Sequence, residues 1–329
     1  MATIKEIASQ TGLSPATVSR VLNYDDTISV SDSARVLIFD TAEKLGYQKK
    51  RVHPPIGNIA LLYWNDGTEE LEYAYYKSLR AELERQARER KISLTRIDKS
   101  QGVSAMPEPC NGFIAIGWFS KSELDVLKGR TKNGVFVDYS PDESAYDSVK
   151  PNLDSIVKQM VDFFYQKGHK NIGYIGQCDF DMATGKPSLD VREWSFRNTA
   201  AYYGILREEN ILIAEALTVE RGYRIGLEAI ERFGENLPSA FCVGSDTLAV
   251  GVIQALHEKK LEIPERVALL SINNSSVAGY LSPPLSTFHI DVPEMCRTAI
   301  QLLTERVFEN REITKTVYIN GRLIERKSC

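Results

Sequence analysis

From residue 58 onward, short apolar runs alternate with amphipathic segments, and this alternation limits the possible folds more than any other feature. The apolar runs are NIALLYW (58–64), GFIAIGW (112–118), VFVDY (135–139), NIGYIG (171–176), AFCVGSD (240–246) and VALLSI (267–272). Strands that alternate with helices predict parallel sheets covered on both faces. Because about 270 residues exceed one α/β unit, we expect two doubly wound parallel-sheet subdomains. Ligands of such folds bind at the carboxyl ends of the strands.

The first fifty residues instead predict a small all-α unit. Thr3 followed by Glu6 is the capping-box pattern of a helix start. Gly12 allows a tight turn, after which Ser14 can cap a second helix that has Pro15 at its first position. Pattern and turn therefore predict two short helices in sequence.

A third helix is expected between Ser31, a candidate cap, and Gly46. Its apolar stripe comprises Ala34, Leu37, Ile38, Ala42 and Leu45. After Tyr47 the segment QKKRVHPPIG contains two adjacent prolines, which exclude a continuous helix. We interpret this segment as a linker.

Composition excludes several classes of protein. No run reaches the ~18 apolar residues of a membrane span, and the start MATIKEIASQ lacks the build of a signal peptide. We therefore expect a cytoplasmic protein without a membrane partner. The 5 cysteines and 4 histidines show no disulfide or metal-ligand spacing, so no metal and no cofactor is expected. No nucleophile elbow or phosphate-cradling loop stands out, which argues against an enzyme and against any catalytic residue.

Two helices joined by a glycine-containing turn are typical of the helix-turn-helix, whose second helix lies in the major groove of DNA. The expected second helix starts with small side chains, so that its amino end can approach a duplex closely. Hydroxyls of Thr17 and Ser19 can bond phosphate oxygens, while Pro15, Ala16 and Arg20 can meet bases. Caps and spacing alone fit equally well a capped helix in any small helical domain.

The specific residues favour DNA binding. The segments TIKEIASQTGLSPATVSRVLN and ISVSDSARVLIFDTAEKLGYQ resemble the DNA-binding head of LacI-type transcriptional repressors. GHKNIGYIG, AFCVGSDTLAVGVIQALHEKKLEIPERVALLSINN and SPPLSTFHID resemble landmarks of the same family's effector domain, which is similar to periplasmic sugar-binding proteins. The resemblance implies a dimeric repressor of double-stranded operator DNA, controlled by a small sugar. It is closest to members that respond to galactose or galactosides.

Residue by residue, the resemblance implies that Thr17, Ser19 and Asn23 contact the DNA backbone, with Pro15, Ala16 and Arg20 nearest the bases. Further candidate DNA contacts are Thr3, Ser14, Lys49, Lys50 and Arg51. The linker departs from the family, because KKRVHPPIG is short and lacks the usual hinge-helix motif. We therefore expect no normal hinge-helix kinking of the DNA. Lys49, Lys50 and Arg51 either bind phosphate or form a solvated basic linker.

The resemblance also implies an effector site, for which a sugar needs carboxylates, amides, an arginine and a stacking aromatic ring. Asp138 and Arg192 match the family's sugar-binding aspartate and effector-binding arginine. Ser245 stands where asparagine is common, and Asn273 where many sugar-responsive members have aspartate. Among the aromatic candidates Tyr63, Trp64, Tyr75 and Tyr76, the sequence favours Trp64 and Tyr75, with Tyr223 as a further candidate. Core packing is the alternative for each aromatic ring.

Four segments follow from this interpretation. We expect a head at 1–48 and an atypical hinge at 49–57. The first subdomain is expected at 58–151 with 282–309, and the second at 152–281 with 310–329. The charged segment AELERQARER corresponds to a helix that helps form the family's dimer, and no heptad extension follows LIERKSC, so we expect a homodimer.

Two alternative functions stay open. One is a regulator of the same family that responds to a purine or another ligand, since Asn273 replaces the usual aspartate. The other is a sugar-binding protein without a role on DNA, which would have no use for the head.

Overall fold

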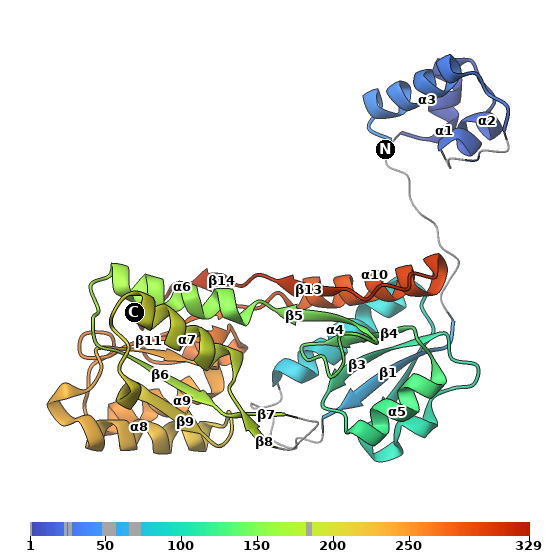
Figure 1. Cartoon of the computed structure of the whole chain (residues 1–329). Helices are drawn as coiled ribbons and strands as arrows, with labels where there is room; N and C mark the ends of the chain where they lie inside the picture. The colour runs from blue at the N-terminus through green and yellow to red at the C-terminus, as the bar shows by residue number, and fades with distance from the viewer. Residues whose placement is uncertain (1, 23–24, 26–27, 48–56, 66–73, 182–185) are drawn as a thin grey trace. The chain divides into compact units, whose positions relative to one another are not determined.

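The computed structural model describes residues 2–22, 25, 28–47, 57–65, 74–181 and 186–329. It divides into two compact units, residues 1–54 and 55–329, which we call the head and the body. Figure 1 shows helices in the head and layers of sheet and helix in the body.

The described part of the head contains helices α1 (Ile4–Thr11), α2 (Pro15–Leu22) and α3 (Asp32–Lys44). The predicted caps are confirmed. Thr3 and Glu6 form a reciprocal capping box before α1, and the Ser31 hydroxyl accepts from the Ala34 amide at 3.3 Å before α3. Gly12 ends α1 with a φ of 69°, a left-handed conformation that glycine adopts without a steric penalty.

The head has its own apolar core, made by Ile7, Ala8, Val18, Val21, Leu22, Ile38 and Ala42. The prediction that Leu37 belongs to this core is wrong, since its side chain is 47% exposed. Leu37 lies about 100° around α3 from the buried Ile38. It therefore stands at the edge of the face that α1 and α2 cover.

The body contains two six-stranded sheets, each within a lobe of its own. The first lobe has the strand order β13-β5-β4-β3-β1-β2, and its neighbouring strands are parallel. The strands are β1 (Ile59–Trp64), β2 (Leu94–Asp98), β3 (Gly112–Gly117), β4 (Gly134–Val137), β5 (Asp147–Pro151) and β13 (Thr316–Ile319). Helices α4 (Ala74–Glu89), α5 (Lys121–Arg130) and α10 (Val292–Glu309) cover this sheet. Every residue of β1 and β3 is buried, which explains their continuous apolar sequence.

The second lobe has the strand order β14-β12-β11-β10-β6-β9, parallel except for β14. Its strands are β6 (Ile172–Gln177), β9 (Ile211–Ala214), β10 (Ala240–Val243), β11 (Ala268–Asn273), β12 (Ser286–His289) and β14 (Arg322–Ile324). Its helices are α6 (Leu153–Gln166), α7 (Val191–Tyr202), α8 (Val219–Phe233) and α9 (Asp246–Glu258). A hairpin of β7 (Asp179–Asp181) and β8 (Lys186–Ser188) connects β6 to α7. The short 3-10 segments are η1 (Lys99–Gln101), η2 (Val103–Ala105), η3 (Glu208–Asn210), η4 (Gly234–Asn236) and η5 (Ser276–Tyr280).

The chain crosses between the lobes at positions other than those expected. We assigned 282–309 to the first lobe, but β12 pairs with β11 in the second sheet. We assigned 310–329 to the second lobe, but β13 pairs with β5 in the first sheet. Both strands are four residues long, and so short a segment carries no sequence signal for which sheet edge it joins.

Among the described residues, no helix is long and apolar enough to cross a bilayer. These residues also contain no group of three or more histidine, cysteine or acidic side chains that could hold a metal ion.

Candidate functional site

Asp138 follows β4 at the carboxyl end of the first sheet, with a left-handed φ of 78°. Such a backbone is unfavourable for a non-glycine residue and is typical of functional positions. The Tyr75 hydroxyl donates to one carboxylate oxygen of Asp138 at 2.8 Å, and the Tyr76 hydroxyl to the other at 3.3 Å. Burial raises the pKa of Asp138, while these two hydrogen bonds and the charge of Arg192 oppose the shift. The result is a buried carboxyl group whose partners orient it.

Arg192 lies in the first turn of α7 in the second lobe, and Asp190 holds it. The guanidinium donates from Nε and Nη2 to the two carboxylate oxygens of Asp190, at 2.8 and 2.6 Å. Nη1 donates to the carbonyl of Gly244 at 3.0 Å. Burial acts to lower the pKa of Arg192, but the charge of Asp190 outweighs it and the pKa is raised. Arginine has five N–H donors, so two remain for a ligand beyond these described contacts.

Asp138 and Arg192 come from different lobes, and the charge of Arg192 acts on the Asp138 carboxyl. Each is fixed by other side chains. The carboxylate of Asp138 can accept hydrogen bonds from ligand hydroxyls, and the guanidinium of Arg192 can donate two parallel hydrogen bonds. Groups of these two kinds orient a polyhydroxylated ligand. Asn273, the last residue of β11, stands at the carboxyl end of the second sheet with a φ of 115°. A second non-glycine residue with a strained backbone therefore marks the same type of position in the second lobe.

Trp64 and Tyr223 are not arranged as the sequence led us to expect. Trp64 is 2% exposed, stacks on Phe119 at 4.7 Å and donates its indole N–H to Glu123 at 2.7 Å. It is a core residue of the first lobe. Tyr223 lies within α8, and its hydroxyl donates to Glu258, the last residue of α9.

Ser245 serves a local purpose. It is 2% exposed, and its hydroxyl accepts from the Leu248 amide at 3.2 Å as the N-cap of α9. A buried helix start needs such an acceptor. The structure shows this capping role, and the ligand contact expected of Ser245 stays a prediction.

Four residues near this region were missed from the sequence. Asp190 was hidden because Asp is a common helix cap. Trp118 and Tyr139 directly follow β3 and Asp138, and the rule that ligands bind at strand ends could have identified both. Tyr174, inside β6, has a buried hydroxyl without a hydrogen-bond partner among the described residues. Only the tertiary structure shows that this hydroxyl lies close to Gly176 and Gly244, at the ends of neighbouring strands.

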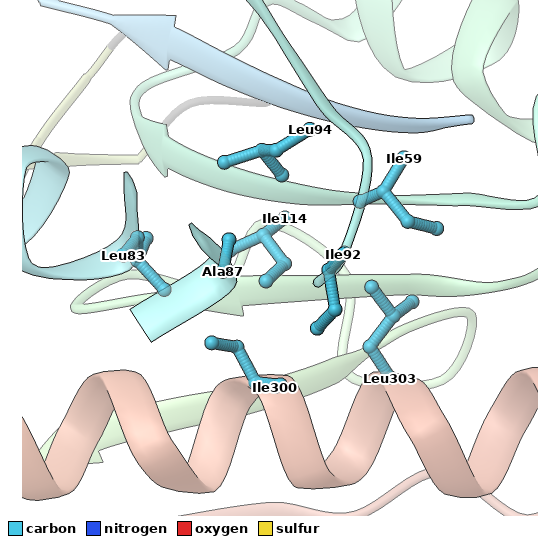
Figure 2. Close-up of a pocket in the computed structure, with 8 residues that line it drawn as sticks. All are labelled: Ile59, Leu83, Ala87, Ile92, Leu94, Ile114, Ile300 and Leu303. Atoms are coloured by element: carbon cyan, nitrogen blue, oxygen red, sulfur yellow. The ribbon is translucent and has the colours of Figure 1, made fainter. Parts of the chain in front are cut away.

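An apolar cavity in the first lobe is a poor alternative site. Figure 2 shows its lining residues, which are Ile59, Leu83, Ala87, Ile92, Leu94, Ile114, Ile300 and Leu303. They come from α4, β1, β2, β3 and α10, and from the loop that precedes β2. Because this lining contains no polar side chain, it offers nothing to orient a polar ligand.

The amino end of α2 forms a second candidate site, in the head. The Ser14 hydroxyl accepts from the Thr17 amide at 3.0 Å and lies 2.8 Å from the Thr17 hydroxyl. Ser14, Pro15 and Ala16 are exposed, whereas Val18 on the opposite face is fully buried. This end therefore presents small polar groups and the positive pole of the helix dipole to its surroundings, an arrangement suited to phosphate.

The other residues predicted to contact DNA differ in their exposure and in the side chains they contact. Ser19 is half-buried and Arg20 exposed, and Arg20 forms an ion pair with Asp25 at 2.7 Å. The Thr3 hydroxyl is engaged with Glu6 in the capping box. Asn23, Lys49, Lys50 and Arg51 lie outside the described residues, as does the hinge up to residue 56.

Comparison with known families gives two matches. Residues 3–50 match a family described as bacterial regulatory proteins, lacI family. Residues 161–329 match a family described as periplasmic binding protein-like domain.

Curated relatives match over the whole chain. The HTH-type transcriptional regulator GanR of Bacillus subtilis is 45% identical, over 100% of this chain and 99% of its own. The regulators LacR of Lactobacillus helveticus and GalR of Lacticaseibacillus casei are 36% and 34% identical, again over 100% of this chain and 98% and 99% of theirs. These relatives are transcriptional regulators rather than enzymes.

Solved structures share the fold. A complex of the transcriptional regulator CelR with cellobiose has a TM-score of 0.70 at 19% identity, over 100% of both chains. The Lac repressor dimer bound to operator and the anti-inducer ONPF has a TM-score of 0.67 at 17% identity, over 99% of this chain and 98% of that one.

Proposed function

The chain belongs to the LacI family of bacterial regulatory proteins, and from this we propose that it represses sugar-utilisation genes under the control of galactose or a galactoside. The observation that best supports the sugar assignment is the pairing of Asp138, held by Tyr75 and Tyr76, with an Arg192 that Asp190 orients. The names of relatives such as GalR and LacR favour a galactose-type ligand within the sugars.

In this proposal the head binds operator DNA through the amino end of α2. Ser14, Thr17 and Ser19 contact phosphates, and Pro15, Ala16 and Arg20 lie nearest the bases. A near-palindromic operator requires two heads. We therefore propose a homodimer, in keeping with the dimer in the Lac repressor structure. A regulator of this type acts where the chromosome is, which for a bacterium is the cytoplasm.

The effector-binding residues we propose are Asp138, Arg192, Tyr75 and Asn273. Their bonds to a sugar would draw the two lobes together, because Asp138 and Arg192 belong to different lobes. If closure changes the spacing of the heads, sugar and DNA weaken each other's binding by the same factor. The protein itself catalyses no step.

A mobility-shift assay tests this function. The full chain is added to its own upstream DNA and titrated with galactose, lactose, other sugars and purines. We expect selective binding over random competitor and release by a galactose-containing sugar. Release by purines alone would contradict the sugar assignment, and equal binding to random DNA would contradict the regulator.

A truncation separates the two sites. Removal of residues 1–57 leaves the body with its own core. The truncated chain should lose DNA binding and keep the sugar affinity of the full chain, measured by calorimetry. Loss of sugar binding in the truncated chain would place the effector site elsewhere.

A further inference from the structure

Trp118 directly follows β3, and its ring is turned outward at the carboxyl end of the first sheet. It is 38% exposed, whereas the next residue, Phe119, is fully buried against Trp64. Gly117 has a φ of 103°, and a Cβ there would lie 2.2 Å from the Trp64 carbonyl oxygen. The turn that presents Trp118 is therefore fixed by a glycine that no other residue can replace without strain.

Trp118 belongs to a row of aromatic rings that begins at Asp138. The ring of Tyr75 contacts that of Tyr76 edge-on at 5.3 Å, and Tyr76 contacts Trp118 edge-on at 5.7 Å. Tyr139, which follows Asp138 in sequence, lies 6.4 Å from Trp118 on another side. The first two rings of this row donate their hydroxyls to Asp138. Trp118 is thus one ring further from the carboxylate, and its neighbours hold its orientation.

Trp118 presents a large aromatic surface to solvent at the end of β3. An exposed indole loses the free energy that burial would give it, about 2 kcal/mol for a large apolar side chain. A sugar ring carries a flat patch of C–H groups on one face. This patch can stack on the flat face of an indole whose orientation is fixed by its neighbours. Tyr75 and Tyr76 are bonded to Asp138, and Trp118 is the next ring in the row after them.

We propose that Trp118 forms a second sugar subsite, so that the preferred effector contains at least two linked sugar rings. This inference rests on the proposed sugar-binding function of the Asp138 region and adds the size class of the ligand. The first ring supplies hydroxyls to Asp138 and Arg192, and the second stacks on the indole of Trp118.

Calorimetry on the full chain tests the subsite with galactose as the single ring, and with lactose and galactose–galactose disaccharides as two-ring ligands. The native chain should bind a disaccharide more tightly than galactose. Trp118→Ala should weaken disaccharide binding by ~10-fold or more, as expected for the loss of a stacked ring, and change galactose affinity less than twofold. Trp118→Phe, which keeps a flat ring, should retain most of the disaccharide affinity.

Trp194→Ala is the matched control, because Trp194 is also exposed, at 47%, and lies on α7 about 200° around the helix from Arg192. It should leave both affinities unchanged. Equal weakening of galactose and disaccharide binding by Trp118→Ala, or no weakening, overturns the second subsite while the sugar-binding function stands. If the native chain binds no sugar of either size, the proposed function fails and the subsite with it.

Discussion

Asp190 performs two tasks for Arg192, two residues further along the chain. Its carboxylate caps α7 by accepting from the Arg192 backbone amide at 2.7 Å, and it also binds the guanidinium of the same residue through Nε and Nη2. Asp190 is 4% exposed, so both tasks are performed away from solvent. The side chain that starts the helix therefore also sets the direction of the arginine.

Asp190→Asn separates these tasks. The amide oxygen can still accept from the backbone amide, but the charge and one acceptor for Arg192 are lost. A hydrogen bond to a charged group contributes about 1.5–3 kcal/mol. We therefore expect Asp190→Asn to lose about 1.5–3 kcal/mol of stability in thermal unfolding. Sugar affinity should fall by about 10-fold or more in calorimetry, because Arg192 is no longer oriented.

The control is Thr218→Ala, which removes the hydroxyl that caps α8 by accepting from the Arg221 amide. It should cost about 1 kcal/mol of stability and leave sugar affinity unchanged. An Asp190→Asn chain with native affinity would show that Arg192 needs no positioning by this carboxylate.

Sugar binding should depend on pH through Asp138. Burial raises the pKa of this carboxyl above its ordinary value of 3.8. Affinity should fall as the pH drops through the raised pKa, because a protonated carboxyl loses its charge and an acceptor. Asp138→Asn should bind weakly and without this pH dependence, measured by calorimetry at several pH values.

The pH dependence of folding has the opposite sign, which separates it from binding. A carboxyl whose pKa is raised in the folded state holds its proton more tightly than in the unfolded chain. Asp138 therefore contributes stability that is present below the unfolded pKa and lost as the pH rises through the folded one.

Asp142→Asn is the control for the pH dependence of sugar binding, because Lys128 lowers the pKa of Asp142 to about 2. If that pH dependence follows Asp142, Asp138 is not the group that binds.

Ser14 and Ser31 provide a matched pair in the head. Each hydroxyl accepts from a backbone amide at a helix start, at 3.0 Å for Ser14 and 3.3 Å for Ser31. Each change to alanine should cost about 1 kcal/mol, measured by thermal unfolding. Only Ser14→Ala should weaken binding to upstream DNA further, since Ser14 stands at the end that we assign to the duplex. Equal DNA affinities of the two variants would contradict that assignment.

Asp147 should be a large contributor to the stability of the body. It is fully buried in β5, accepts from both terminal nitrogens of Arg311, and accepts from the Lys315 amide at 2.9 Å. Asp147→Ala removes the bidentate partner of Arg311 and takes the acceptor from the Lys315 amide. Arg311 keeps its ion pair with Glu305 at 3.3 Å. The change should cost about 3 kcal/mol in denaturant unfolding. Glu220→Ala removes an exposed ion pair with Arg224 and should cost under about 1 kcal/mol. Similar costs for the two variants would mean that burial of Asp147 is unimportant.

The sequence by itself determined the features that depend on near neighbours in the chain. The caps at Thr3, Ser14 and Ser31 are recognisable because a cap and its amide partner are three residues apart. The alternation of apolar runs and helical patterns predicted parallel sheets, because a strand buried on both faces must be apolar throughout.

The tertiary structure alone decided which side chains face the ligand region. Trp64 ends β1 and Trp118 directly follows β3, yet Trp64 is buried against Phe119 and Trp118 is exposed. Likewise, no local pattern reveals that Asp190 binds Arg192 or that β12 and β13 join opposite lobes. The physical reason is that a side chain's environment depends on what packs across from it. The residues that pack against it lie far away in the sequence. The spacing of apolar residues in a segment predicts only which face of that segment is buried.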